Sequence, residues 1–216
     1  MNTRATVIFD FDGTLANSVD LLFDLYNEHV DEFGYRPLTR NEFPSLRRMG
    51  YKKAMKTKGI RYRMVPKMVV TIGREMRHRM NEVQPYDGII DMLHTLQQRG
   101  FSIGVLTSNQ APLVKEFFTE HGFPSFDFVI SEKTLFGKDK ALRRIIKRFG
   151  LQKDQVIYVG DEPRDVSASR KAGIQVIGVT WGLGGREGFE KIAPDAVVEK
   201  PLELLNTIIE TTDSTT

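Results

Sequence analysis

Short apolar runs alternate with helical patterns over most of the chain. Residues 6–9 form an apolar, partly β-branched run, and similar runs predict strands at 101–106, 126–130, 156–159, 176–179 and 196–198. Between these runs, apolar residues at helical spacing predict helices over 87–98, 111–121, 138–149, 164–172 and 202–209. Strands that alternate with helices of this length indicate right-handed crossovers and a parallel sheet.

The stretch between the first two strands has a different pattern. Apolar residues at helical spacing predict a helix over 19–33, and the sequence that follows, through Asn81, is mainly helical with no clear strand. Breaks are expected near Pro44, Gly50, Gly59 and Pro66. We therefore expect an α/β fold, a Rossmann-like parallel sheet with helices on both faces, formed by residues 1–16 and 85–216. Residues 17–84, called the inserted segment below, form an all-helical lid.

Charge separates the same two parts of the chain. Between Tyr35 and Asn81 there are fourteen basic and two acidic residues, a net charge of +12, whereas the rest of the chain carries −9. The basic stretch is a solvated helical surface, a surface that steers phosphorylated substrates, or a face that docks on nucleic acid. If it steers substrates, one or two of four basic side chains would contact them: Arg47, Arg48, Lys52 and Lys53.

Several protein classes are excluded by composition. There is no cysteine, so disulfides, thiolate metal sites and cysteine nucleophiles are absent. No basic-then-apolar leader opens the sequence, and no apolar run approaches the roughly 20 residues of a membrane span. We expect a cytoplasmic protein with no membrane partner; a monomer and a homodimer are both compatible with the sequence.

Polar residues that can carry chemistry follow the predicted strands. The first strand runs into Asp10-Phe11-Asp12-Gly13-Thr14, the second into Thr107-Ser108-Asn109, and the fourth into Gly160-Asp161-Glu162, with Asp165 shortly after. The third is followed by a loop that leads to Lys138. Because open parallel sheets form their sites beyond the carboxyl ends of the strands, we expect these groups to converge.

Phosphoryl transfer accounts for this combination of residue types. A carboxylate can attack phosphorus and form an aspartyl-phosphate, but a hard cation must first reduce its repulsion from the phosphate. A dense set of oxygen ligands suits Mg²⁺. A second acid can protonate the leaving alkoxide, and Thr107 and Lys138 can stabilise charge on the phosphoryl oxygens.

The motifs resemble those of a known superfamily. The run from Phe9 to Leu15 resembles the first signature of the haloacid dehalogenase-like hydrolases, and Thr107, Lys138 and the run from Gly160 to Asp165 resemble the second, third and fourth. The position of the inserted segment is similar to that of the helical cap in the phosphoglycolate phosphatase-like subgroup. The resemblance extends from Thr6 to about Thr180.

The resemblance implies a role for each motif residue. Asp10 would be the nucleophile and a metal ligand, and Asp12 the general acid and base, with its backbone carbonyl on the metal. Thr107 and the Ser108 backbone would hold the phosphoryl group, and Lys138 would neutralise it. Asp161 would ligate Mg²⁺. Asp165 would not bind the metal directly but would orient Lys138 or a metal-bound water, with help from Glu162.

Two positions depart from the subgroup's pattern. Its third motif often reads Lys-Pro-x-Pro, but here Lys138 is followed by Asp139-Lys140-Ala141, so that Lys140 and Lys133 are rivals for the role. We favour Lys138 because it lies where the helix begins. Ser108-Asn109 stands where related phosphatases often have Asn-Lys, which affects substrate preference and leaves the chemistry unchanged.

The expected function is hydrolysis of a small phosphorylated metabolite. Similar dehalogenases have no acid at the position of Asp12, so its presence favours phosphate ester hydrolysis over dehalogenation. The alternatives are a phosphomutase of sugar phosphates and a non-catalytic module that binds anions or nucleic acid, although nucleic acid is the less favoured partner. Trp181, Gly182, Gly184 and Gly185 follow the fifth strand and are expected to form a loop beside the cleft.

Overall fold

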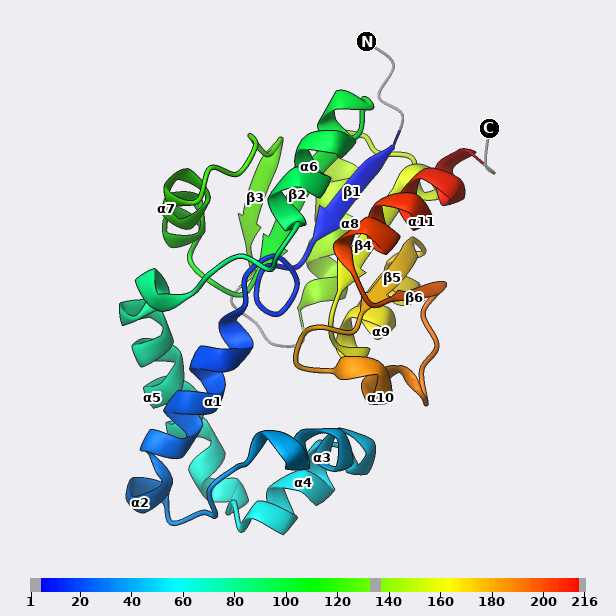
Figure 1. Cartoon of the computed structure of the whole chain (residues 1–216). Coiled ribbons are helices and arrows are strands. Elements are labelled where there is room, and N and C mark those ends of the chain that lie inside the picture. Colours follow the sequence, from blue (N-terminus) through cyan, green and yellow to red (C-terminus); the bar gives the residue numbers. More distant parts are fainter. Residues whose placement is uncertain (1–4, 133–136, 214–216) are drawn as a thin grey trace.

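The centre of the molecule is a parallel β-sheet. The computed structural model describes residues 5–132 and 137–213, and in this part of the chain six strands pair in the order β3-β2-β1-β4-β5-β6 (Figure 1). The strands are β1 (Thr6–Phe9), β2 (Ser102–Thr107), β3 (Phe128–Ser131), β4 (Val156–Gly160), β5 (Gln175–Val179) and β6 (Ala196–Val198). Each predicted strand is present, within two residues of its expected bounds.

Helices cover both faces of this sheet. Val7 and Phe9 of β1 pack in one apolar cluster with α6 (Ile89–Gln98), α7 (Ala111–Glu120) and α11 (Pro201–Asp213). Ile8 points to the other face, where its cluster includes residues of α8 (Lys138–Phe149) and α9 (Pro163–Ala172). Since alternate residues of a strand face opposite sides, a run that is apolar throughout predicts such two-sided burial. The predicted fold class is confirmed.

The inserted segment gathers its helices at one end of the molecule, beyond the end of β1 (Figure 1). Its longer helices are α1 (Ser18–Glu28), α2 (Val30–Phe33), α3 (Phe43–Met49), α4 (Tyr51–Lys58) and α5 (Val65–His78). Three short 3₁₀ turns connect them, at Arg40–Glu42, Tyr62–Met64 and Met80–Glu82. The segment has a small buried cluster of its own, made of Phe33, Tyr35 and Met68.

The two connections between the inserted segment and the rest of the chain lie side by side. Ala16 pairs with Pro85 in an antiparallel bridge, and the Asn17 N–H donates to the Gln84 carbonyl at 2.8 Å. Leu21 of α1 packs in the same apolar cluster as β1. This pairing supports the division at residues 16/17 and 84/85, which we retain as a proposal.

Within the inserted segment the structure corrects one predicted helix. The helix expected over 19–33 is interrupted at His29, whose backbone is not helical (φ −98°, ψ 11°). The His29 ring lies 2.9 Å from carboxylate oxygens of both Glu32 and Glu75, so the break places this side chain between two acids.

Helix boundaries lie near all four expected breaks. Gly50 and Gly59 have positive φ values of 75° and 78° and separate or end helices, as expected. Pro44 and Pro66 instead stand in the first turns of α3 and α5, where the missing N–H of proline removes no helical hydrogen bond. After β5, part of the expected loop forms a short helix, α10 (Gly185–Phe189).

Candidate active site

The carboxyl ends of the three central strands meet as predicted. Asp10 directly follows β1, Thr107 is the last residue of β2, and Asp161 directly follows β4. Because β1 lies between β2 and β4, with Phe9 paired to both Val105 and Val159, these three ends are neighbours. Asp10, Thr107 and Asp161 are all buried.

Lys138 joins this cluster from the start of α8. Its Nζ lies 2.6 Å from Asp10 Oδ2 and 2.5 Å from Asp165 Oδ1. Burial lowers the pKa of Lys138, but the charges of Asp10 and Asp165 outweigh it and raise that pKa well above the ordinary value. The ammonium group is therefore charged near neutral pH. Of its sequence rivals, Lys140 is exposed on α8, and Lys133 lies outside the described residues.

Three buried carboxylates form a group that can hold a cation. Asp10, Asp161 and Asp165 each offer one oxygen, and these oxygens lie within 4.8 Å of one another. Burial raises the pKa of Asp10, with a further rise from Asp165. Burial also raises the pKa of Asp161, with further contributions from Glu162, Asp165 and Asp10. A divalent cation bound by oxygen would relieve this repulsion, so the residues present fit such an ion.

The three carboxylates differ in what else they contact. Asp165 Oδ1 accepts from Lys138 and its Oδ2 accepts from the Glu162 N–H at 3.0 Å, so both of its oxygens are engaged. Asp161 Oδ2 accepts from the Leu183 N–H at 2.7 Å, and Asp10 Oδ1 accepts from the Phe11 N–H at 2.8 Å. Asp10 also accepts from Lys138 through Oδ2, so of the three carboxylates Asp161 keeps the most free acceptor capacity for a metal.

Asp12 lies beside Asp10 in a different environment. Its Oδ2 accepts a hydrogen bond from the Asn109 side chain at 2.7 Å, while its Oδ1 is buried with no partner among the described residues. Burial, followed by the neighbouring charge of Asp10, raises the pKa of Asp12 to about 6. This carboxyl group can therefore both give and take a proton near neutral pH.

Asn109, which the sequence analysis linked only to substrate preference, contacts two of the predicted site residues. In addition to its bond to Asp12, its backbone N–H donates to Thr107 Oγ1 at 2.9 Å. That bond fixes Thr107 with its hydroxyl hydrogen free to donate elsewhere. Ser131, at the end of β3, donates to the Asn109 carbonyl and secures the turn. The signal available in the sequence was the position of Asn109 two residues after the end of β2.

A small polar cavity joins most of the predicted site residues. It measures about 20 Å³, close to the space of one water molecule. Ser108 is exposed at its rim. The residues that line it are Asp10, Asp12, Leu106, Thr107, Ser108, Glu132, Lys138 and Arg164. Sequence reasoning gave no role to Arg164, the second residue of α9.

Glu162 contacts the inserted segment as well as the core. Its carboxylate forms an ion pair with Arg164 and accepts a hydrogen bond from the hydroxyl of Tyr51, the first residue of α4. Glu162 was predicted to assist from behind the metal ligands. In the structure its oxygens are engaged by these two groups.

The glycines after β5 pack against the acidic cluster. A Cβ at Gly182 would lie 2.3 Å from the Gly13 carbonyl oxygen and 2.4 Å from Asp161. A Cβ at Gly13, where φ is 71°, would lie 2.4 Å from Asp161 Oδ2. Both positions therefore require glycine, because any side chain would displace Asp161. The expected loop beside the cleft is in fact part of the wall around this carboxylate.

The inserted segment is bound to this wall near Arg47. The Arg47 Nε donates to the Leu183 carbonyl at 2.6 Å, and a terminal nitrogen donates to the Gly182 carbonyl at 2.9 Å. Arg48 forms ion pairs with Glu187 and Glu190 at 3.6 and 3.3 Å. Lys52 and Lys53, the other two candidate substrate contacts, are exposed.

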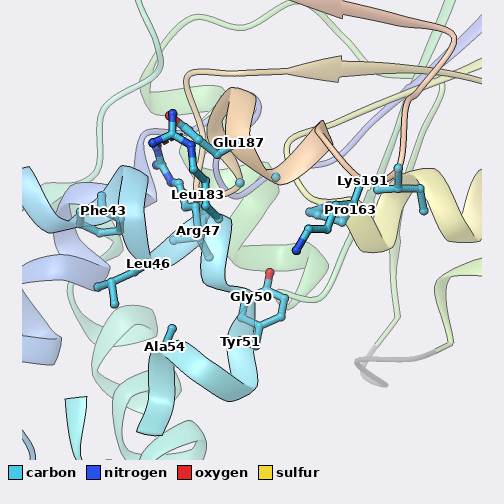
Figure 2. A pocket seen from close by; sticks show the side chains of 14 residues that line it. Phe43, Leu46, Arg47, Gly50, Tyr51, Ala54, Pro163, Leu183, Glu187 and Lys191 are labelled. Atoms are coloured by element: carbon cyan, nitrogen blue, oxygen red, sulfur yellow. Dashed lines mark hydrogen bonds and ion pairs between the residues drawn. The ribbon is translucent and has the colours of Figure 1, made fainter. Parts of the chain in front are cut away.

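A larger, mostly apolar pocket lies between these contacts (Figure 2). Its volume is about 360 Å³, and α3, α4 and α10 supply much of its lining. Apolar side chains from both parts of the chain line it: Phe43, Leu46, Ala54, Pro163, Leu183 and Ile192. Tyr51 projects from the start of α4 with its hydroxyl directed toward the core (Figure 2).

Acids of the inserted segment itself, and a few of the core, pair with many of the segment's basic residues. Arg40 contacts Asp20, Lys67 contacts Glu32, and Arg79 contacts both Glu28 and Glu82. Lys58 contacts Glu42 inside the segment. Together with Arg47 and Arg48, these pairs reduce the positive potential that the sequence count implies.

The fold and the acidic strand ends define an α/β enzyme with its site at the carboxyl edge of a parallel sheet. Residues 7–179 match the haloacid dehalogenase-like hydrolase family, and the chain belongs to it. The chain is 31% identical over 205 residues to a phosphoglycolate phosphatase of Synechococcus elongatus, covering 94% of this chain and 97% of that protein.

Other relatives agree with this placement. The chain is 25% identical to the pyrophosphatase PpaX of Bacillus pumilus, over 94% of this chain and 96% of that protein. A crystal structure of a predicted phosphatase from Clostridium acetobutylicum shares the fold with a TM-score of 0.77 at 22% identity, covering 95% and 98% of the two chains. The expected class of enzyme, a haloacid dehalogenase-like phosphatase, is confirmed. Helices long and apolar enough for a membrane span are absent from the described residues.

Proposed function

We propose that this protein is a Mg²⁺-dependent phosphomonoesterase that acts on a small phosphorylated metabolite through an aspartyl-phosphate at Asp10. The observation that carries the proposal is the contact of a buried carboxylate, Asp10, with the ammonium group of Lys138, beside a second carboxyl group whose pKa is near neutrality. A nucleophile, a charge-neutralising cation and a proton donor thus share one cavity.

In the first half of the reaction, an Asp10 oxygen attacks phosphorus as the bond to the ester oxygen breaks. Protonated Asp12 gives its proton to the leaving oxygen, which departs as an alcohol. Lys138 and the Thr107 hydroxyl donate to the phosphoryl oxygens, on which charge accumulates. In the second half, a water molecule attacks the phosphorus of the aspartyl-phosphate while the Asp12 carboxylate accepts its proton. Asp10 is then released together with inorganic phosphate.

The environment of Asp12 supports its double role. A carboxyl group with a pKa of about 6 is populated in both protonation states near neutral pH, as a residue that alternates between acid and base requires. Asn109 holds one Asp12 oxygen, which leaves the other free to face the reacting groups. A halide leaving group needs no proton, so this arrangement favours ester hydrolysis over dehalogenation.

Mg²⁺ would be held by Asp10 and Asp161, with the Asp12 backbone carbonyl as a further ligand. When bound, this ion neutralises the nucleophile and the phosphate and holds them together. Asp165, which is fully buried and accepts from Lys138 and the Glu162 N–H, would contact these groups and not the metal. Its part is to orient Lys138.

The inserted segment would open to admit substrate. Arg47, Arg48 and Tyr51 of the segment contact the core, so we take the described conformation as a closed one. Closure would keep bulk water away from the aspartyl-phosphate. The identity with a phosphoglycolate phosphatase makes phosphoglycolate the first substrate to assay. The pairing of basic residues with acids counts against a nucleic-acid-binding role.

The test is hydrolysis of an aryl phosphate and of phosphoglycolate, with Mg²⁺ and with EDTA. We expect metal-dependent release of phosphate that Asp10→Asn reduces by about 10⁴-fold or more. Asp24→Asn, an exposed carboxylate on α1, is the matched control and should keep full activity. Metal-independent turnover or an active Asp10→Asn enzyme would contradict the proposal. A sugar phosphate added to the assay distinguishes a mutase, which would give an isomer in place of free phosphate.

A further inference from the structure

The reaction described above gives no role to the guanidinium group of Arg164. Arg164 lies in the first turn of α9, and its side chain lines the same cavity as Asp10, Thr107 and Lys138. Its positive charge lowers the pKa of both Asp10 and Asp12, against the larger effect of burial. Arg164 is therefore electrostatically coupled to the two acids that would carry the reaction.

The guanidinium group of Arg164 is only partly satisfied. A terminal nitrogen pairs with Glu162, whereas Nε is buried and has no acceptor among the described residues. A buried donor left unpaired has a free-energy cost. An acceptor that enters the cavity with the substrate would remove this cost.

The count of donors at the cavity indicates which acceptor this is. Lys138 has three N–H donors, and two of them point to Asp10 and Asp165. The phosphoryl group presents three equatorial oxygens that each accept more than one hydrogen bond, so Lys138, Thr107 and the Ser108 backbone leave room for a further donor. A guanidinium group is well suited to phosphate because it is always charged and its N–H groups are held in a plane.

The position of Arg164 depends on the inserted segment. Glu162 is buried, and its two carboxylate oxygens are divided between Arg164 and the Tyr51 hydroxyl. Burial and the charge of Glu162 raise the pKa of Tyr51, so its hydroxyl remains a donor. Tyr51 stands at the start of α4, directly after the Arg47 and Arg48 contacts to the core (Figure 2). This hydrogen bond is therefore present when the inserted segment is closed on the core.

We propose that Arg164 is a further catalytic residue, which donates its Nε–H to the transferring phosphoryl group, and that Tyr51 positions it through Glu162. Closure of the inserted segment then completes the set of phosphoryl donors. The inference rests on the proposed phosphatase function. It goes beyond that function by adding a phosphoryl contact and a physical link between the inserted segment and the cavity.

The first experiment measures inhibition by orthovanadate, a mimic of the transferring phosphoryl group, in the presence of Mg²⁺. For Arg164→Gln we expect a Ki about 10- to 100-fold higher than that of the unmodified protein, with a similar fall in kcat/KM. Arg164→Lys keeps a charge opposite Glu162 but has no Nε–H, so it should fold normally and still lose about tenfold in affinity. An unchanged Ki in Arg164→Lys would overturn the assignment to Nε.

The second experiment tests the positioning by Tyr51 with a double-mutant cycle. Tyr51→Phe should lower kcat and vanadate affinity about 3- to 10-fold with KM nearly unchanged, and should add less than about twofold to Arg164→Gln. Tyr62→Phe removes another hydroxyl from the inserted segment, one that reaches only the Lys52 carbonyl at 3.4 Å, and should have no effect. Independent effects of Tyr51→Phe and Arg164→Gln would overturn the link.

Asp10→Asn separates this inference from the proposed function. If Asp10→Asn is inactive and the Arg164 variants bind vanadate normally, only the inference is wrong. If Asp10→Asn keeps full activity, the proposed function itself is wrong.

Discussion

Two cavities lie on either side of the contact between Tyr51 and Glu162, and they differ in how their walls are held. The cavity at the strand ends is lined mostly by polar and charged groups of the core, which come from the strand ends and from the starts of α8 and α9. The pocket under α3 and α4 is larger and mostly apolar, and its opposite walls come from the inserted segment and the core. Arg47, Arg48 and Tyr51 supply the polar contacts across it.

This difference separates the chemistry from its control. The strand ends fix the reacting groups through backbone pairing, which a ligand cannot easily change. The contacts at α3 and α4 are few and polar, so a moderate change in free energy can open them. The predictions below test this separation, first at the strand ends and then across the contact.

The largest effect is expected at Asp12. Asp12→Asn should lower kcat for an alkyl phosphate by about 10²- to 10⁴-fold, because the leaving alkoxide then receives no proton. For an aryl phosphate with an acidic leaving phenol the fall should be much smaller. Steady-state kinetics on the two substrates measures this difference, and equal losses on both would remove Asp12 as the general acid.

The same residue should make metal-free stability depend on pH. The pKa of Asp12 is about 6 in the folded protein and near 3.8 when unfolded, so folding favours its neutral form. The contribution of Asp12 to the free energy of unfolding is complete below pH 3.8 and is lost as the pH rises through 6. The loss amounts to about 3 kcal/mol. Urea denaturation in EDTA between pH 4 and 7 should show this loss in the unmodified protein. A parallel curve for Asp12→Asn would contradict it.

A methyl group at Gly182 should disturb the proposed metal site by displacing Asp161. Its Cβ would lie 2.4 Å from Asp161, so Gly182→Ala should raise the Mg²⁺ concentration for half-maximal activity about 10- to 100-fold. Gly188→Ala is the control, because its Cβ would lie 3.5 Å from Pro163, an ordinary contact. Magnesium titrations of activity compare the two, and identical requirements would mean that Asp161 does not bind the metal.

The smallest effects are expected across the contact itself. Arg47, whose side chain is 21% exposed, donates to two carbonyls, so its loss should cost about 1.5–3 kcal/mol of closure. Arg48 is 58% exposed, and its ion pairs should contribute less than about 1 kcal/mol. Hydrogen exchange over residues 43–58 should therefore rise about tenfold or more in Arg47→Ala and less than about fivefold in Arg48→Ala. The reverse order would show that the exposed pairs hold the segment closed.

Much of the core could be predicted from the sequence because its signals are local. Apolar runs of strand length and glycine-ended helices located the parallel sheet, and strand ends in such a sheet converge by geometry. This rule predicts that Asp10, Thr107 and Asp161 lie together, as the structure shows. Lys138 followed from the start of its helix, although α8 enters the site from outside the central strands.

What the sequence did not reveal depends on contacts between distant segments. The Asn109 side chain reaches Asp12 across the fold, and that of Arg164 reaches the shared cavity. The closeness of Gly182 to Asp161 is a packing constraint that no local pattern records. The charge count overstated the basic surface, because the acids that pair with it lie outside the counted stretch.

The paired connections at Ala16 and Pro85 have a consequence for how such a protein can vary. The two ends of the inserted segment are joined by a hydrogen bond, so they lie as close together as the two ends of a tight turn. The entropy of closing a loop grows only with the logarithm of its length, so segments of other sizes can join the same two points at little cost. The same sheet can therefore carry inserted segments of many different sizes.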